Sequence, residues 1–432
     1  MLPLPWRAGP NWDVLDPVTE PLTGAVLRGL GDAPPRTLGV AVSGGGDSAA
    51  LLHLLATQSC FGGIALSAAT VDHGLREGAA AEAAQVAQLC DSLGIAHTTL
   101  RWRGWDGSGN LQDEARRARY GLLADWAKSA GLDAVALGHT LEDQAETVVM
   151  RLARRSGVDG LSAMAPRRTR EGVVWLRPLL DVRRQDLRAY LAGNSVEWID
   201  DPSNDDPRFE RVRIRRALAL LDDLGVSAAA LSEVSQHMRQ AQGALADATA
   251  RLARDAVRIE AGCVAVDSAL LRAAPEEIQR RLWRAVLRWI SGAEYAPRRT
   301  SLEGLTRAAR DGTAGTLGGV ALCSRKDKVW AYREYNAVSA LRSDAARVWD
   351  TRWQVKGSDG AGANAARICA LGPNGLKQCD NWRAHGIPRA ALLGLPGLWH
   401  DDTLVSAPVV KHHPQWHWSL TRSADAFIAQ PL

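Results

Sequence analysis

A glycine-rich segment that joins a β-prone run to a helix-prone run constrains the fold of this 432-residue chain most strongly. Residues 37–42 (TLGVAV) are short, apolar and β-prone, SGGGDS occupies 43–48, and AALLHLLA follows with helical character. This order predicts a strand, a glycine loop and a helix. Because backbone amides and the helix dipole converge at the start of such a helix, we expect the loop to bind an anion.

The composition of the loop favours phosphate as that anion. Gly44, Gly45 and Gly46 let the backbone approach phosphates closely and adopt positive φ, while Ser43 and Ser48 offer hydroxyl donors. The segment lacks the GKS or GKT of a Walker loop, so no lysine reaches a γ-phosphate and we expect it to hold pyrophosphate. The alternative, a glycine turn that only connects two elements, is disfavoured by the flanking strand and helix.

The alternation of β-prone and helix-prone runs continues to about residue 155. The β-prone runs are GIALSAATVDHG, IAHTTLRW and AVALGH, and the helix-prone runs between and after them are AAAEAAQVAQLCDSLG, QDEARRARYGLLADWAKSAG and EDQAETVVMRLARR. Such alternation predicts the α/β class, with a doubly wound parallel sheet covered by helices on both faces. Ligands in such folds bind beyond the C-terminal ends of the strands.

The length predicts two or three domains, and the character of the sequence changes after residue 217. Residues 218 to about 290 are rich in Ala, Leu and Arg with helical periodicity and no clear strand, whereas LGGVALCSRKDKVWAYREY is typical of a hairpin. The Gly- and Ala-rich segment 357–366 is expected to be a linker or mobile loop. We therefore predict an α/β domain, a mostly helical domain and a small mixed domain at 1–217, 218–335 and 345–432.

Composition places the chain among folded cytoplasmic proteins. Hydrophobic residues make up 46% and charged residues 23%, which argues against disorder. The six cysteines show neither a CxxC pair nor metal-ligand spacing, so we expect reduced thiols. No apolar run approaches the ~20 residues of a membrane span, and the start MLPLPWRAGPNWD lacks the pattern of an export signal.

Basic residues are concentrated in one segment. Residues 151–216 hold 15 Arg, no Lys and 10 acidic residues, a net charge of +5 in a chain whose total is +4. The complete preference for Arg favours phosphate recognition through bidentate forks. A solvated face of ordinary ion pairs is the equal alternative.

Acidic side chains cluster where the β-prone run AVALGH is followed by the helix-prone run EDQAETVVMRLARR. The spacing of Glu142, Asp143 and Glu146 places them near one another, just after His139. Such carboxylates suit Mg²⁺ binding or capture of an ammonium group. The alternative is a set of helix-start acids that only interact favourably with the helix dipole.

Two further groups of residues are each compatible with two interpretations. Arg116 and Arg119 lie three apart on a predicted helix and can face one ligand or phosphate, or be solvated. Tryptophans interleaved with basic residues in the tail suit base stacking, although a small domain also needs aromatic residues in its core. These tryptophans are Trp349, Trp353, Trp382, Trp399, Trp416 and Trp418.

The loop and several downstream segments resemble a known family. SGGGDS is similar to the SGGxDS loop of the ATP-pyrophosphatase (PP-loop) superfamily. Over residues ~37–216 the order and spacing of the later segments resemble the tRNA(Ile)-lysidine synthetase family. These segments are VDHGLR (71–76), ARRARY (115–120), GHTLEDQAET (138–147), GLSAM (160–164), RPLL (177–180) and WIDDPSNDD (198–206).

The resemblance implies an adenine-nucleotide alpha-hydrolase-like fold and a specific reaction. The family uses ATP and Mg²⁺ to join L-lysine to C2 of the wobble cytidine in the CAU anticodon of tRNA(Ile), with release of AMP and pyrophosphate. The codon and amino-acid specificity then change from methionine to isoleucine. It further implies that the second and third domains bind tRNA, and that the protein forms a homodimer.

The resemblance also implies roles for individual residues. The implied catalytic residues are Asp47, Arg119, Asp143 and Glu146, with Asp47 and Asp143 as Mg²⁺ ligands. The implied ATP-binding residues are Ser43, Gly44, Gly45, Gly46, Asp47, Ser48, His73 and His139, and the implied tRNA-binding residues are Arg116, Arg211 and Arg215. The chain departs from the family pattern at Thr140, where a second His is usual, and at Val212, where an Asn is usual.

Two other functions are compatible with a PP-loop chain. A tRNA thiolation enzyme uses the same loop, but that chemistry usually calls for paired cysteines, which are not found here. A tRNA-binding protein without catalysis is the second alternative, and the intact SGGGDS and the acidic cluster argue against it.

Overall fold

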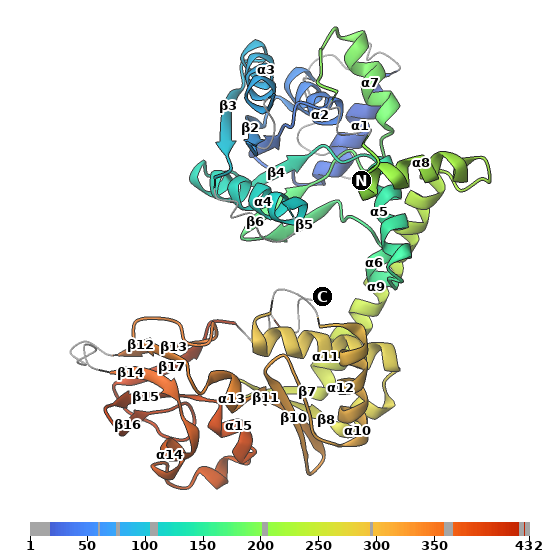
Figure 1. Ribbon diagram of the computed structural model, residues 1–432. Coiled ribbons are helices and arrows are strands. Elements are labelled where there is room, and N and C mark those ends of the chain that lie inside the picture. The colour runs from blue at the N-terminus through green and yellow to red at the C-terminus, as the bar shows by residue number, and fades with distance from the viewer. Residues whose placement is uncertain are drawn as a thin grey trace. The chain divides into compact units, whose positions relative to one another are not determined.

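The computed structural model describes residues 18–58, 61–74, 78–103, 111–200, 206–293, 297–357, 366–422 and 427. The chain divides into two compact units, Met1–Gln242 and Gly243–Leu432 (Figure 1). The three domain boundaries expected from the sequence stay a prediction. The segment 357–366, expected to be a linker or mobile loop, lies almost wholly outside the described residues.

The first unit alternates helices and strands along the chain. Its strands are β1 (Thr37–Ala41), β2 (Ala65–Asp72), β3 (Ala96–Arg101), β4 (Ala134–Leu137), β5 (Arg167–Arg170) and β6 (Val173–Leu176). Its helices are α1 (Thr19–Leu30), α2 (Gly46–Thr57), α3 (Ala79–Ser92), α4 (Leu111–Ser129), α5 (Leu141–Ala153), α6 (Val158–Leu161), α7 (Arg184–Gly193) and α8 (Glu210–Asp222), and α9 (Ala228–Ala256) begins in it.

The six strands form one sheet in the order β3-β2-β1-β4-β6-β5. All neighbours pair in parallel except β5, which is antiparallel to β6. The chain moves outward from β1 through β2 to β3 and then crosses back to place β4 on the other side of β1. This is a topological switch point, where the connections diverge and leave a crevice at the strand ends. The predicted doubly wound parallel sheet is confirmed.

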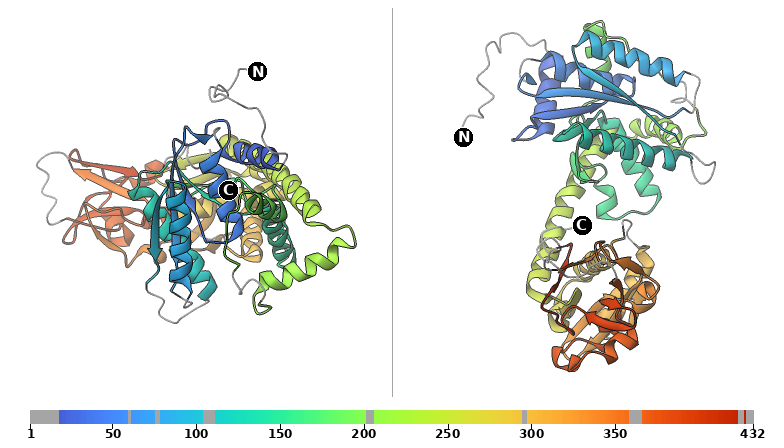
Figure 2. Two further views of the ribbon diagram at one scale, coloured as in Figure 1. Left: turned by 90° about the horizontal axis from the view of Figure 1, so that it is seen from above. Right: turned by 90° about the vertical axis from the view of Figure 1, so that its left-hand side faces the viewer.

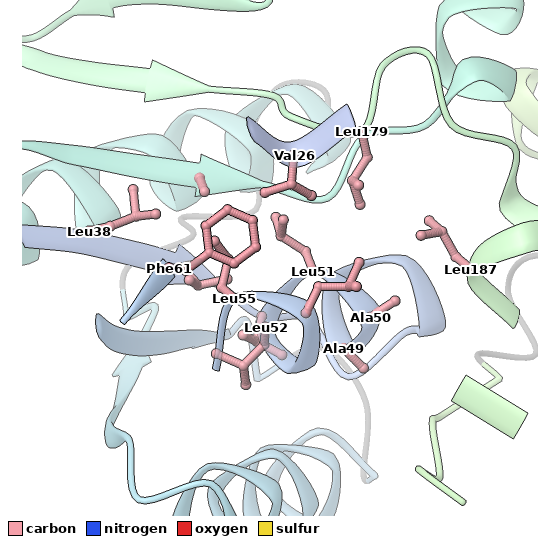
Figure 3. Close-up of a cluster of buried hydrophobic side chains, with 14 of the residues drawn as sticks. Val26, Leu38, Ala49, Ala50, Leu51, Leu52, Leu55, Phe61, Leu179 and Leu187 are labelled. Carbon is pink, nitrogen blue, oxygen red and sulfur yellow. The ribbon is translucent and has the colours of Figure 1, made fainter. Parts of the chain in front are cut away.

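Alternate residues of the central strands feed two apolar cores, one on each face of the sheet. Leu38 and Val40 of β1 pack with α1, α2, α3 and α7, whereas Ala41 packs on the other face with α4. Figure 3 shows the first of these cores, in which Val26 of α1 and Leu51 and Leu55 of α2 meet near Leu38. Because both faces of the central sheet are covered, β4 and β6 are apolar along their whole length, as buried parallel strands usually are, whereas the outer strands β3 and β5 carry polar residues.

The second unit contains more strand than the sequence indicates. Its strands are β7 (Val257–Glu260), β8 (Cys263–Asp267), β9 (Gly315–Leu317), β10 (Val320–Arg325), β11 (Lys328–Arg333), β12 (Arg342–Asp344), β13 (Trp353–Gly357), β14 (Arg367–Ala370), β15 (Pro396–His400), β16 (Thr403–Ser406) and β17 (Trp416–Leu420). Its helices are the end of α9, α10 (Ser268–Ala273), α11 (Glu276–Ser291), α12 (Arg299–Asp311), α13 (Tyr335–Val338), α14 (Gly372–Lys377), α15 (Arg389–Leu393) and the 3₁₀ helix η4 (Trp382–His385). Figure 2 gives two further views.

The expectation of no clear strand between 218 and 290 is wrong. β7 and β8 form a hairpin in which Glu260 pairs with Cys263 around a two-residue turn. Both turn residues, Ala261 and Gly262, have positive φ, as such a tight turn requires. The helical composition on both sides hides this short run of β-branched residues. The predicted hairpin of β10 and β11 is confirmed, and it joins β7 and β8 in a five-stranded sheet.

The six tryptophans of the tail pack in or against one apolar core of the second unit. Trp349, Trp353 and Trp416 are buried in it, and the other three are partly buried against it. The positions of these six tryptophans therefore agree with the interpretation that they form a core. Among the described residues, no helix is both long enough and apolar enough to cross a membrane.

Gly39 in β1 leaves room for the indole ring of Trp126 in α4. A Cβ at Gly39 would lie 2.7 Å from two ring carbons of Trp126, in a core that cannot easily yield. Gly39→Ala should therefore lower the free energy of unfolding by about 1–3 kcal/mol. The control is Gly121→Ala in α4, where a Cβ meets nothing within 4 Å and a gain of about 0.5–1 kcal/mol is expected. Urea unfolding of both variants checks this, and equal effects would contradict the packing argument.

Candidate active site

The switch point of the sheet places two chemically different segments side by side. β1 and β4 pair in parallel, with Ala41 opposite Leu137. The glycine loop 43–48 leaves the carboxyl end of β1, and His139 and the start of α5 follow the carboxyl end of β4. The register therefore brings the expected phosphate loop beside the expected acidic cluster.

The glycine loop is shaped by a left-handed residue and by a serine hydroxyl. Gly44 has a φ of +86°, and its carbonyl accepts a 2.9 Å hydrogen bond from the N–H of Ile199. A Cβ at Gly44 would lie 2.6 Å from Cδ1 of Ile199, so only glycine fits. The Ser48 hydroxyl donates to the Gly45 carbonyl at 3.0 Å and accepts the Ser43 N–H at 3.1 Å. Ser48 thus closes the loop on itself before any ligand arrives.

Gly138, which follows β4, allows close contact between the segment after β4 and the first turn of α2. A Cβ at Gly138 would lie 2.9 Å from Cα of Ser48 and 3.0 Å from the carbonyl of Asp47. The backbone after β4 therefore passes against the first turn of α2, and the beginnings of α2 and α5 lie next to each other. Asp47 and Asp143 share this junction.

Asp143 caps the helix on which it lies. Its Oδ2 accepts the backbone N–H of Thr140 at 2.9 Å, and the pair forms a capping box at the start of α5. Burial raises the pKa of Asp143, but the positive charges of Arg184 and Arg211 and the hydrogen bond from the Thr140 N–H outweigh it, so the net shift is downward. Asp143 is therefore held as a carboxylate. Thr140, the departure from the family pattern, is fully buried as the cap of α5.

Arg184, the first residue of α7, joins the two carboxylates. Its Nε donates to Oδ2 of Asp47 at 3.0 Å, and its Nη2 lies 3.5 Å from Oδ1 of Asp143. Burial raises the pKa of Asp47 above its usual value, and Arg184 opposes that rise. The sequence does not single out Arg184, although it lies in the arginine-rich segment. Its spacing from the two acids along the chain gives no signal of the contact.

Glu146 is buried one turn further along α5. Its carboxylate is fully inaccessible, and Oε1 accepts the Nε–H of Arg215 at 3.0 Å. Arg211, also from α8, lies 4.0 Å from Oε2 of Glu146 and 3.7 Å from Oδ1 of Asp143. Burial, followed by the charge of Asp143, raises the pKa of Glu146 despite these cations. Arg211 and Arg215, expected to meet tRNA, pair here with the acidic residues.

Val212 explains how α8 is held at this site. It is the buried residue of α8, with 6% of its surface exposed, and Arg211 and Arg215 of the same helix contact the acids. The family pattern has an amide at this position. An apolar side chain is therefore buried at this point of the helix.

A cavity of about 530 Å³ opens beside the glycine loop, at the ends of β1 and β2. Ser43, Gly45, His73 and Arg119 line it together with small apolar residues from α3 and α4. This volume is in the range of small-molecule sites. Burial lowers the pKa of His73, and the positive charge of Arg119 lowers it further, so His73 is neutral near neutral pH.

The remaining expected residues lie at different depths. His139 is partly exposed as a residue, but its Nδ1 is buried without a hydrogen-bond partner, and desolvation lowers the pKa of the imidazole strongly, so the ring is neutral. Arg116 is exposed, with its guanidinium 5.5 Å from the ring centroid of Tyr120, and it does not line the cavity. Gln144 exchanges hydrogen bonds of 2.9 and 2.8 Å with the backbone of Met164, which ties GLSAM to α5.

Comparison with known proteins identifies the family of this chain. A family profile described as a PP-loop domain matches residues 20–221. The tRNA(Ile)-lysidine synthase of Ruegeria pomeroyi is 46% identical over 402 residues, which cover 92% of this chain and 94% of that protein. The chain belongs to the tRNA(Ile)-lysidine synthase family.

Other members of the tRNA(Ile)-lysidine synthase family match over shorter stretches. The synthase of Rhodopseudomonas palustris is 43% identical over 281 residues, or 64% of this chain and 80% of that protein. Among solved structures, a U34-tRNA thiolase from Methanococcus maripaludis aligns with a TM-score of 0.44 and 17% identity, over 51% of this chain and 78% of its own. That likeness is too low to carry an argument. Membership in a PP-loop family implies the use of ATP.

Removing Arg215 should reveal the buried charge of Glu146. Since the folded state already disfavours the Glu146 carboxylate, its ionisation costs stability above the unfolded pKa, and protonation relieves that cost. Arg215→Met should therefore lower the free energy of unfolding by about 3 kcal/mol near pH 8 and by less near pH 5. The control, Arg154→Met, breaks the exposed pair with Glu210 and should cost less than about 1 kcal/mol at either pH. Urea unfolding at both pH values measures this, and a loss for Arg215→Met that does not depend on pH would contradict it.

Proposed function

We propose that this chain joins L-lysine to C2 of the wobble cytidine of tRNA(Ile) with a CAU anticodon, using ATP and releasing AMP and pyrophosphate. The observation that carries the proposal is the 46% identity to a tRNA(Ile)-lysidine synthase along almost the whole length of both chains. The junction of glycine loop, acids and cavity supports it independently. The modified tRNA then reads isoleucine rather than methionine codons.

The chemistry requires activation of an unreactive carbonyl. The C2 oxygen of cytidine attacks the α-phosphate of ATP, which forms an oxygen–phosphorus bond and releases pyrophosphate. The ε-amine of lysine then attacks C2, loses a proton and expels AMP, which carries the former carbonyl oxygen. Both steps develop charge on phosphate oxygens, so fixed donors at the phosphates accelerate them.

The glycine loop and the neighbouring cavity divide the binding of ATP between them. The amides of residues 43–48 and the start of α2 suit the pyrophosphate portion. The cavity next to it, apolar over much of its wall, suits the adenosine, and Arg119 lines it with a partly buried positive charge. In this proposal Arg119 stabilises the α-phosphate during transfer, and His73 and His139 contact the nucleotide as neutral imidazoles.

The donor set at the junction fits a magnesium ion that arrives with ATP. Asp47 and Asp143 present carboxylate oxygens around one guanidinium, and Mg²⁺ commonly uses one or two carboxylates together with substrate phosphates. Among the described residues no group of three or more His, Cys, Asp or Glu is arranged to hold a metal by itself, which agrees with a shared site. Bound there, the ion supplies charge neutralisation to the phosphates.

Glu146 is suited to the lysine side chain. Its buried carboxylate accepts a hydrogen bond from the guanidinium of Arg215, and an ammonium group makes the same kind of charge-assisted hydrogen bond. Its raised pKa brings it closer to the range useful for accepting a proton. In the proposal Glu146 orients the amine and takes its proton as the amine attacks.

The proposal assigns the tRNA to the arginine-bearing side of this site. Arg116 is exposed next to Tyr120, and Arg211 and Arg215 keep more than a third of their side chains exposed while they contact the acids. Guanidinium groups of this kind bind phosphates bidentately. Additional tRNA contacts from residues 218–335 and 345–432, and assembly as a homodimer, belong to the same proposal.

The thiolation alternative finds little support at the site. In the described part of the first unit the cysteine is Cys90, which is fully buried in the core and whose pKa is raised to about 11 by burial. A sulfur-transfer step needs an accessible thiolate. A tRNA-binding protein without catalysis would not need acids held at the phosphate loop.

Substrate dependence of pyrophosphate release tests the proposal. Purified protein with ATP should release pyrophosphate only when both lysine and tRNA(Ile) with a CAU anticodon are present. The anticodon nucleoside should gain the mass of lysine less one water. Release that requires a sulfur donor instead would select thiolation, and no release under any condition would select a binding protein.

Loss of either shared carboxylate should abolish lysine transfer. Asp47→Asn and Asp143→Asn keep the size of the side chain but remove its charge, so kcat/KM should fall at least about 100-fold. The matched control is Asp113→Asn, an exposed acid in the first turn of α4, which should keep wild-type activity. Lysine incorporation into tRNA is the measurement, with a thermal melt of each variant to confirm folding. Full activity of Asp47→Asn or Asp143→Asn would refute their assigned roles.

A further inference from the structure

Arg184 has more contacts at the junction of α2 and α5 than an ordinary ion pair requires. Its Nε donates to Asp47 at 3.0 Å, while Nη2 lies 3.5 Å from both Oδ1 of Asp143 and Oγ1 of Thr140. Its backbone N–H donates to Oε2 of Glu142 at 3.0 Å. Main chain and side chain of this residue are therefore both fixed by the segments that carry the proposed active site.

The guanidinium lies between two carboxylates of different chain segments. The side chains of Arg184 and Asp47 are each about one-fifth exposed, at 21% and 22%, and that of Asp143 is 10% exposed. Two carboxylates at such depth repel each other strongly without a cation between them. The planar fork of arginine reaches both at once, which a single ammonium group does less well.

We infer that Arg184 is a positioning residue, which supplies the positive charge between Asp47 and Asp143 in the nucleotide-free chain and gives up that place to a divalent cation. The inference rests on the proposed function, because the cation is the one expected with ATP. Arg184 neutralises the two carboxylates until that cation binds. Without it, the two carboxylates form an open pair that a small cation can fill directly.

The surroundings of Arg184 explain why its loss leaves a cation site rather than a collapsed one. Asp143 is held by the Thr140 N–H, and Asp47 is fixed in the first turn of α2 against Gly138. The carboxylate of Asp143 and the backbone that carries Asp47 therefore stay in place when the guanidinium is removed. Arg211 remains near Asp143 at 3.7 Å, but its ion pairs are with Asp143 and Glu146, and not with Asp47.

The test measures thermal unfolding with magnesium alone. Arg184→Met removes the charge and keeps an apolar side chain. In EDTA its melting temperature should fall by roughly 5 °C or more relative to wild type. Millimolar MgCl₂, without nucleotide, should restore at least half of the loss, while the wild-type melting temperature stays unchanged. NaCl at equal ionic strength should restore much less, because screening does not replace coordination.

Two further variants identify the responsible groups. Arg188→Met removes an arginine one turn further along α7, whose partner Asp200 is exposed, and it should show no response to MgCl₂. The double variant Arg184→Met with Asp47→Asn should lose the recovery, since one of the two ligands is gone. If Arg184→Met does not fold, Arg184→Lys carries the test, and its melting temperature should rise more with MgCl₂ than that of wild type.

A melting temperature of Arg184→Met that MgCl₂ and NaCl change equally would overturn the inference. So would a response of Arg188→Met equal to that of Arg184→Met, or an unaltered recovery in the double variant. The measurement contains neither lysine nor tRNA. A negative result in the melting test therefore contradicts the role of Arg184 but not the proposed reaction. The absence of lysine-dependent pyrophosphate release, in contrast, would contradict the proposed reaction, and the magnesium response of Arg184→Met would then need another explanation.

Discussion

The parallel pairing of β1 with β4 is the constraint on which the active site depends. It places the ends of two strands that are far apart in sequence at one edge of the sheet, so that an anion-binding loop and a carboxylate-bearing helix begin side by side. The contact is close because Gly138 has no Cβ to hold the first turn of α2 away. A substitution at Gly138 would therefore separate the loop from the acids without altering either of them chemically.

Charge balance is the second requirement of this junction. Carboxylates are buried at it, and each is paired with an arginine that comes from another element: Arg184 from α7 for Asp47 and Asp143, and Arg215 from α8 for Glu146. Buried ion pairs contribute little net stability, but removal of one partner is costly. The arginines of the segment 151–216 thus pair with acids inside the first unit, as Arg184 and Arg215 do, and at its surface, as Arg154 does with Glu210. Recognition of phosphate by this segment stays a prediction.

The order of the β and α elements in the first unit could be predicted because the periodicity of apolar residues and the positions of glycines are local signals in the sequence. The glycine loop, the parallel sheet and the nearness of Asp143 to Glu146 follow from spacing alone. Arg184 could not be found in this way, since its contacts join residues far apart in the chain. Nor could the pairing of Arg211 and Arg215 with Asp143 and Glu146, since α6, β5, β6 and α7 lie between α5 and α8 in the chain. The hairpin of β7 and β8 was missed because helical residues surround a short β-prone run. The residue roles implied by the family resemblance stay predictions.

The contact between Gly44 and Ile199 has a consequence for the way the protein is made. The left-handed glycine is held by a hydrogen bond from a residue that follows α7, near the end of the segment matched by the PP-loop profile. A ribosome that has synthesised only the first four strands has therefore produced the loop but not the residue that fixes its shape. The nascent chain therefore completes this hydrogen bond of the anion site only after most of the first unit has been synthesised.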